Sequence, residues 1–238
     1  MSLRGKLMGK KIQTPFFMFN PKSYLYGEKI TEMADVAEEI AKKYPSITVL
    51  LTCQHVDMRL VAPRVKHVKI VAQHMDAIVP GRGMGAILPE GIRDAGAQVV
   101  LLNHAEHPMT MDAIIRAMER AEDLGLETIV CANSLKEAIA IATLKPSIIL
   151  CEPTALIGTG QTSTASYIKS TNQAIKSVSP KTLVMQAAGI TSPQDVYEVM
   201  ELGADGVGCT SGITTAKNPP KMLEDMIIAL TEDMGDLP

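Results

Sequence analysis

The segment SIILCE, residues 147–152, is a short run of apolar residues that ends in a glutamate. Seven other runs along the chain have the same character: they are rich in valine, isoleucine and leucine, and they do not alternate with polar residues. Continuous apolar runs of about four to eight residues are typical of parallel strands that are buried on both faces. Eight strands are therefore predicted, at residues 14–19, 47–52, 68–73, 98–103, 127–132, 147–152, 182–187 and 206–210.

Amphipathic segments separate these runs, and several of them carry helix signals. In residues 28–43 the apolar side chains recur at the spacing of one helical face. Ser134, followed three residues later by Glu137, predicts a capping box at the start of a helix. Gly125 stands where a helix would end in a left-handed residue. Helices are predicted at 28–43, 109–123, 134–144, 192–202 and 219–231.

Eight alternations of strand and helix predict an α/β fold, a (β/α)₈ barrel of eight parallel strands in a single domain. A doubly wound open sheet is the competing architecture, and it favours a glycine-rich turn after the first strand. That turn here reads FNPKSY, residues 19–24, which cannot form the dinucleotide-binding fingerprint. Because no linker or low-complexity tract divides the chain, residues 14–238 are assigned to the barrel and residues 1–13 to a basic leader or tail.

Composition narrows the range of functions. The 238 residues carry a net charge of −3 and 3% aromatic side chains, which does not favour a nucleic-acid partner. No apolar stretch reaches the roughly 20 residues that a membrane span needs, so no membrane partner is expected. The four cysteines form no CxxC pair and are expected to be reduced thiols, which favours a cytoplasmic location.

Polar side chains gather at the carboxyl ends of the predicted strands, where (β/α)₈ barrels place their active sites. Lys22 follows the first strand, His104 follows the fourth, and Glu152 ends the sixth. A carboxylate, a neutral imidazole and an ammonium group on one rim suit proton transfer beside a carbonyl group. Backbone N–H groups at Gly189 and Ser211, after the last two strands, are placed to bind a phosphate group.

Three segments at this rim are distinctive: NPKSY at 20–24, LLNHAEH at 101–107 and CEPTALIGTG at 151–160. Together they resemble the triosephosphate isomerase family, most closely its short archaeal type. The last is the most specific, because Glu-Pro followed by Ile-Gly-Thr-Gly is the family's catalytic base and closing lid. The three segments occur in the order and at the spacing of the family, and the resemblance extends from the first predicted strand to the last predicted helix.

The resemblance implies a role for each residue at a matching position. Glu152 would remove the proton, His104 would be a neutral electrophile, and Lys22 would bind the substrate. The pairing of a glutamate base with a neutral histidine is the family's known arrangement and does not follow from spacing alone. Residues 153–160 would close over the substrate as a lid. No metal or other cofactor is implied. The other implied substrate-binding residues are Asn20, Ile157, Gly158, Gly189, Thr210 and Ser211, with Asn103 and Glu106 behind them.

The chain departs from the family pattern around the site. Pro21 replaces a usual aromatic residue, and Ala105 replaces the serine that usually follows the histidine. The resemblance implies interconversion of dihydroxyacetone phosphate and D-glyceraldehyde 3-phosphate through an enediol(ate), the isomerase reaction of glycolysis and gluconeogenesis. Because the departures alter the pocket and spare the catalytic residues, the alternative is the same aldose–ketose chemistry on another small phosphosugar, such as a tetrulose phosphate.

Two further hypotheses concern residues around the rim. The motif QHxD occurs at 54–57 and at 73–76, and its histidines and aspartates are possible metal ligands; hydrogen bonding or a subunit contact explains the repeat as well. A non-catalytic binding barrel would keep the fold but would have no need of the three catalytic side chains. By analogy with the family, we expect a homodimer or homotetramer, with Met84 in a contact loop at 81–86.

Overall fold

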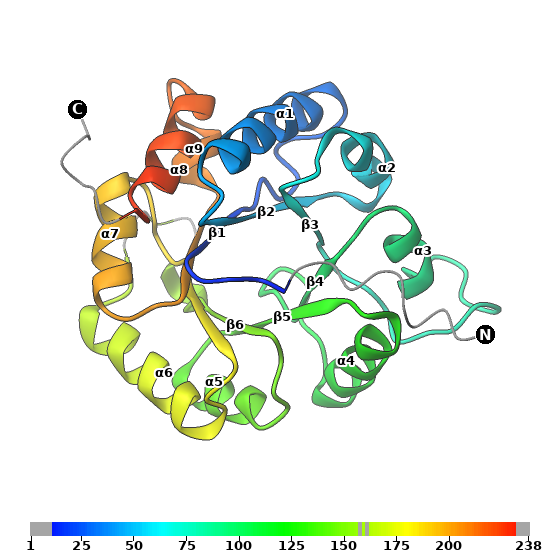
Figure 1. Ribbon diagram of the computed structural model, residues 1–238. Helices are drawn as coiled ribbons and strands as arrows, with labels where there is room; N and C mark the ends of the chain where they lie inside the picture. Colours follow the sequence, from blue (N-terminus) through cyan, green and yellow to red (C-terminus); the bar gives the residue numbers. More distant parts are fainter. Residues whose placement is uncertain (1–10, 157–158, 160–161, 232–238) are drawn as a thin grey trace.

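The computed structural model describes residues 11–156, 159 and 162–231, and it shows a barrel of parallel strands (Figure 1). The strands follow one another around the barrel in chain order, and β1 pairs with β8 to close it. They are β1 (Phe16–Phe19), β2 (Thr48–Cys53), β3 (Lys69–Ala72), β4 (Val99–Leu102), β5 (Glu127–Ala132), β6 (Ile148–Cys151), β7 (Leu183–Gln186) and β8 (Gly206–Cys209). The predicted single-domain (β/α)₈ barrel is confirmed, and each predicted strand boundary lies within two residues of the observed one.

Helices surround the ring of strands (Figure 1). The longer ones are α1 (Glu28–Lys43), α4 (Met111–Leu124), α5 (Leu135–Ala142), α6 (Ala165–Val178), α7 (Pro193–Glu201) and α9 (Pro219–Ile228). The shorter ones are α2 (Met58–Val61), α3 (Pro89–Asp94) and α8 (Ser211–Thr214), with 3₁₀ turns at His55–Asp57, Ala62–Arg64 and Thr154–Leu156. The five predicted helices correspond to α1, α4, α5, α7 and α9. None of the helices in the described ranges is long and apolar enough to cross a membrane.

Helix ends mostly follow the local signals in the sequence. Gly125 ends α4 with a left-handed φ of 69°, as predicted. At α5 the Ser134 hydroxyl accepts a hydrogen bond from the Glu137 N–H, which is the expected half of the capping box. The Glu137 carboxylate, however, accepts from the N–H of Asn133 and not from that of Ser134. The Glu137 carboxylate therefore binds the residue before the N-cap and not the N-cap itself. Only one of the two hydrogen bonds of the predicted capping box forms.

Alternate residues of each strand point to opposite faces of the barrel wall. The inward side chains, among them Phe16, Met18 and Met185, form one apolar cluster that fills the barrel. Gly206 makes room for this packing, because a Cβ atom there would lie 2.5 Å from the ring of Phe16. The outward side chains form a second, larger apolar cluster with the helices. The barrel is therefore a packed support, and its chemistry is confined to the strand ends and loops.

The segment before β1 covers the amino-terminal end of the barrel, and it is drawn in dark blue across the ring of strands in Figure 1. Ile12 is buried against the interior cluster, and its N–H donates to the carboxylate of Glu127 at 3.1 Å. The buried ammonium of Lys69 lies 3.6 Å from the same carboxylate. Residues 11–13 thus pack on the barrel floor, while residues 1–10 of the predicted leader lie outside the described residues.

Candidate active site

Three side chains predicted to be catalytic come together at the carboxyl end of the barrel. Lys22 follows β1, His104 follows β4, and Glu152 comes directly after β6. His104 Nε2 lies 3.6 Å from Glu152 Oε2, and these two side chains are 9% and 14% exposed. Lys22 and Glu152 line the same small cavity. The strand ends therefore place a carboxylate, an imidazole and an ammonium group within reach of one small molecule.

The hydrogen bonding of His104 defines which of its nitrogen atoms carries the proton. Its Nδ1 accepts a hydrogen bond from the backbone N–H of Glu106 at 3.1 Å. Because a ring nitrogen that accepts a hydrogen bond carries no proton, this contact favours the tautomer that carries its proton on Nε2. Nε2 is the atom that faces Glu152. In that tautomer the ring directs an N–H donor toward the space beside the carboxylate.

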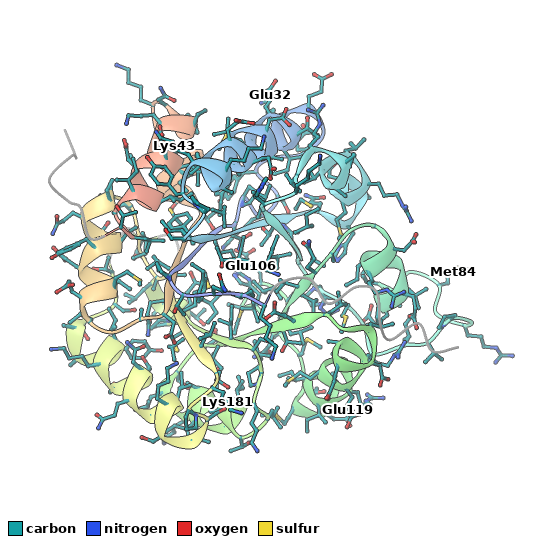
Figure 2. All side chains as sticks on the ribbon, viewed as in Figure 1. Glu32, Lys43, Met84, Glu106, Glu119 and Lys181 are labelled. Carbon is teal, nitrogen blue, oxygen red and sulfur yellow. The ribbon has the colours of Figure 1, made fainter. Side chains whose placement is uncertain are left out.

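Lys22 has a left-handed backbone, with φ of 48°, which is uncommon for a residue other than glycine. Asn20 Oδ1 accepts hydrogen bonds from the Lys22 N–H at 3.1 Å and from the Thr52 hydroxyl at 2.6 Å. The Gln73 amide donates to the Lys22 carbonyl at 2.9 Å. Lys22 Nζ lies 2.7 Å from Oε1 of Glu106, a residue of the loop after β4 that is labelled near the middle of the view in Figure 2. Neighbours on separate strands hold this strained residue, a feature that is frequent at functional sites.

Two more polar residues near the site, Thr52 and Asn103, differ in whether the sequence predicts their role. Thr52 falls inside a predicted strand, and nothing in its sequence context marks it as a partner of Asn20. Asn103 was expected to support the site. It has a left-handed φ of 58°, its amide donates to the Cys131 carbonyl at 3.0 Å, and its Oδ1 accepts from the Met109 N–H at 2.9 Å. Asn103 thus fixes the loop that carries the histidine.

The turns after the last two strands face the same end of the barrel. Gly189 follows β7 and has a left-handed φ of 69°, which glycine adopts without steric cost. Thr210 follows β8 and lines the small cavity, and Ser211 begins α8. The chain therefore brings two short turns near the predicted base, as a bound phosphate group would require.

The predicted lid at residues 153–160 is described in part. A 3₁₀ turn spans Thr154–Leu156, and the Leu156 N–H donates to the Pro153 carbonyl at 2.9 Å. Ile157 and Gly158, two of the predicted substrate-binding residues, lie outside the described residues.

Two cavities lie at this rim, and Asn20 and Lys22 line both of them. The smaller has a volume of about 20 Å³ and is lined by Glu152 and Thr210. The larger has a volume of about 660 Å³ and extends over the loops after β2, β3 and β4, past His104. Lys22 thus lies between a tight space beside Glu152 and a wide polar space beside His104.

A cluster of histidines borders the larger cavity. The rings of His74 and His107 stack with their centroids 4.0 Å apart, and His55 Nε2 lies 2.7 Å from the His74 carbonyl oxygen. Burial is the main cause that lowers the pKa of His74; His107 lowers it further, and Asp76 opposes the shift. Among the residues that the structure describes, no group of three or more histidine, cysteine or acidic side chains is placed to hold a metal ion. The histidines and aspartates of the repeated QHxD motif take part in hydrogen bonds or ion pairs within the fold, and His74 also contacts the ring of His107.

Comparison with known proteins adds an independent observation. The family model described as triosephosphate isomerase matches residues 15–229. The chain is 37% identical to the triosephosphate isomerase of Sulfurisphaera tokodaii, in an alignment that covers 91% of this chain and 96% of that protein. It is 38% identical to that of Metallosphaera sedula, over 91% and 96% of the two chains, and 35% identical to that of Methanocaldococcus jannaschii, over 88% and 97%. The chain therefore belongs to the triosephosphate isomerase family, a family of aldose–ketose isomerases, and its resemblance to the archaeal members is confirmed.

Proposed function

We propose that this chain interconverts dihydroxyacetone phosphate and D-glyceraldehyde 3-phosphate, with Glu152 as the base and His104 as a neutral hydrogen-bond donor. The observation that carries the proposal is the 3.6 Å separation of His104 Nε2 from Glu152 Oε2, with Nδ1 occupied by a backbone N–H. Similarity to proteins named triosephosphate isomerase, over nearly their whole length, supports the choice of substrate.

The proposed reaction is a proton transfer between adjacent carbon atoms. Glu152 takes a proton from the carbon beside the carbonyl group of dihydroxyacetone phosphate. The electron pair of the broken C–H bond forms a carbon–carbon double bond, and the carbonyl electron pair moves onto its oxygen. His104 donates the Nε2 hydrogen bond to that oxygen and stabilises its charge. The protonated glutamate then returns the proton to the neighbouring carbon while the hydroxyl proton moves between the two oxygen atoms, which gives the aldehyde.

Lys22 and the turns after β7 and β8 would bind the anionic substrate. The ammonium of Lys22 lines both cavities, so it contributes positive charge beside the space next to Glu152. Backbone N–H groups at Gly189 and Ser211 would bind the phosphate group. This division leaves Glu152 free for the proton transfer and assigns binding to other parts of the chain.

A four-carbon phosphosugar is the second candidate substrate, and the size of the larger cavity favours it. That cavity, about 660 Å³, adjoins Lys22 and His104 and offers room beyond the space beside Glu152. The deciding experiment measures kcat and KM of the purified chain on triose phosphates and on a tetrulose phosphate. Weak triose activity beside strong tetrose activity would replace the first proposal by the second. Phosphosugar binding without turnover would favour a non-catalytic barrel.

We also propose that the chain assembles as a homodimer or homotetramer through the loops after the first three strands. Large apolar side chains are exposed on these loops and on the short helical segments within them, namely Tyr24, Tyr26, Val56, Leu60, Val79 and Met84. Met84 lies on a loop that extends away from the barrel (Figure 2). Apolar groups gathered in this way are typical of protein interfaces. Sedimentation of the purified chain tests the proposal, and Met84→Asp is expected to favour the monomer. A cytoplasmic location is a further proposal, which the four free, buried cysteines support.

A further inference from the structure

Gln186 is a polar residue in a layer of apolar side chains. It ends β7, it is 2% exposed, and its side chain points away from the barrel interior toward α6. In the described strands, all other outward-facing residues except Thr128 belong to the apolar cluster between the strands and the helices. An amide in such a layer destabilises the fold unless its hydrogen bonds are made, so its presence calls for an explanation.

Two residues of α6 accept hydrogen bonds from Gln186. Its Nε2 lies 3.0 Å from Thr171 Oγ1 and 3.0 Å from Asn172 Oδ1. The Thr171 hydroxyl donates its own proton to the Tyr167 carbonyl at 2.8 Å, so it acts as an acceptor toward Gln186. The Asn172 amide donates to the Leu202 carbonyl at 3.2 Å, which directs its oxygen toward Gln186. The network thus joins the end of β7 to α6 and to the end of α7.

Hydrogen bonding leaves part of this network unsatisfied. Gln186 Oε1 is buried and accepts no hydrogen bond from any described residue, and the buried hydroxyl of Tyr167, one turn earlier on α6, also has no partner among them. An unpaired buried polar group destabilises the folded state. An apolar side chain of similar size would avoid that cost, so stability alone does not explain a glutamine at this position.

The position of Gln186 connects three parts of the proposed active site. It directly precedes the turn 187–189, which contains Gly189. It pairs in the sheet with Cys151, the residue before Glu152. Its hydrogen-bond partners lie on α6, the helix that follows the lid. A displacement of Gln186 would therefore move the turn relative to the base.

We infer that Gln186 is a positioning residue, which sets the phosphate-binding turn 187–189 at its distance from Glu152 by binding β7 to α6. The inference rests on the proposed function, since it takes this turn to bind the phosphate group of the substrate. Misplacement by about 1 Å is enough to reduce an enzymatic rate strongly, so a network remote from the reacting atoms affects turnover through geometry alone.

The test compares a variant at the end of β7 with a variant directly before its start, both in the full-length chain. Gln186→Met keeps the size of the side chain and removes both hydrogen bonds. The matched control is Thr182→Val, one residue before β7, where a threonine that is 2% exposed donates its hydroxyl proton to the Pro146 carbonyl at 2.9 Å. Thr182→Val is expected to have a lower Tm, whereas Gln186→Met is expected to change Tm little, because it removes an unpaired buried oxygen but leaves Asn172 Oδ1 without its donor. Gln186→Met is expected to weaken the binding of inorganic phosphate, measured by titration calorimetry, and to lower kcat/KM at least about tenfold. The control is expected to keep both values within about twofold.

Two results would overturn the inference. One is a folded Gln186→Met variant with unchanged phosphate affinity and unchanged kcat/KM; the other is an equal loss in Thr182→Val, which would point to general destabilisation. If Gln186→Met does not fold, Thr171→Val removes one acceptor of the same network and is judged by the same criteria. A wild-type chain that binds phosphate but turns over no triose or tetrose phosphate would overturn the proposed function, and phosphate affinity alone would then decide the role of Gln186.

Discussion

Replacing Glu152 with aspartate tests the proposed base, because the change moves the carboxylate without removing it. The side chain shortens by one methylene group, so the carboxylate withdraws by about 1.5 Å. The 3.6 Å distance from Glu152 Oε2 to His104 Nε2 would then become about 5 Å, and the distance to a substrate proton would grow by a similar amount. A misplacement of about 1 Å costs up to roughly 100-fold in rate.

We therefore expect kcat of Glu152→Asp to fall by about 100-fold or more, which corresponds to at least about 2.7 kcal/mol of transition-state stabilisation. KM should change far less, because Lys22 and the turns after β7 and β8 are proposed to bind the substrate. The assay couples formation of glyceraldehyde 3-phosphate to a dehydrogenase and records initial rates over a range of substrate concentrations.

A matched control makes the same substitution at the other end of the barrel. Glu127 is a half-buried glutamate on the barrel floor, where it binds the Ile12 N–H and faces Lys69. Glu127→Asp is expected to lower Tm and to keep kcat. An unchanged kcat in Glu152→Asp, or an equal loss of kcat in both variants, would refute the reasoning that makes Glu152 the base.

Three further predictions concern stability. Ile12→Ala should reduce the free energy of unfolding by about 2–5 kcal/mol, measured with urea, without changing kcat, because it leaves a cavity beneath the barrel. Burial raises the pKa of Glu38, but hydrogen bonds from the His67 side chain and three backbone N–H groups outweigh this effect, so the pKa is lowered overall. Glu38→Gln should therefore reduce the free energy of unfolding at neutral pH, and this loss should shrink as the pH falls below 4.5. Burial lowers the pKa of His74, so the folded state binds fewer protons than the unfolded state and loses stability as the pH falls below 6.5. His74→Asn should make the Tm depend less on pH in this range, measured from thermal unfolding curves.

The helices show where prediction from the sequence stops. Helices α1 and α4 have a clear apolar stripe and were predicted from it. Helix α6, ASYIKSTNQAIKSV, was not, because it is rich in serine, threonine and asparagine, which compete with the backbone for hydrogen bonds. Packing of Ile168 and Ile175 against the barrel stabilises it in the fold. Helices α2, α3 and α8 are too short to have a detectable period.

The candidate site also has features that the sequence predicts and features that it does not. The order of the strands and the polar residues that follow them were available from the sequence, because continuous apolar runs are local and parallel strands bring their carboxyl ends to one rim. The backbone hydrogen bond to His104 Nδ1, the ion pair of Lys22 with Glu106 and the hydrogen bonds of Gln186 were not available from the sequence. The ion pair and the hydrogen bonds of Gln186 join residues from different elements, and the contact at His104 depends on the turn that follows β4. These contacts exist only once the barrel has closed, so the sequence determined which chemical groups reach the rim and the tertiary structure decided how they face one another.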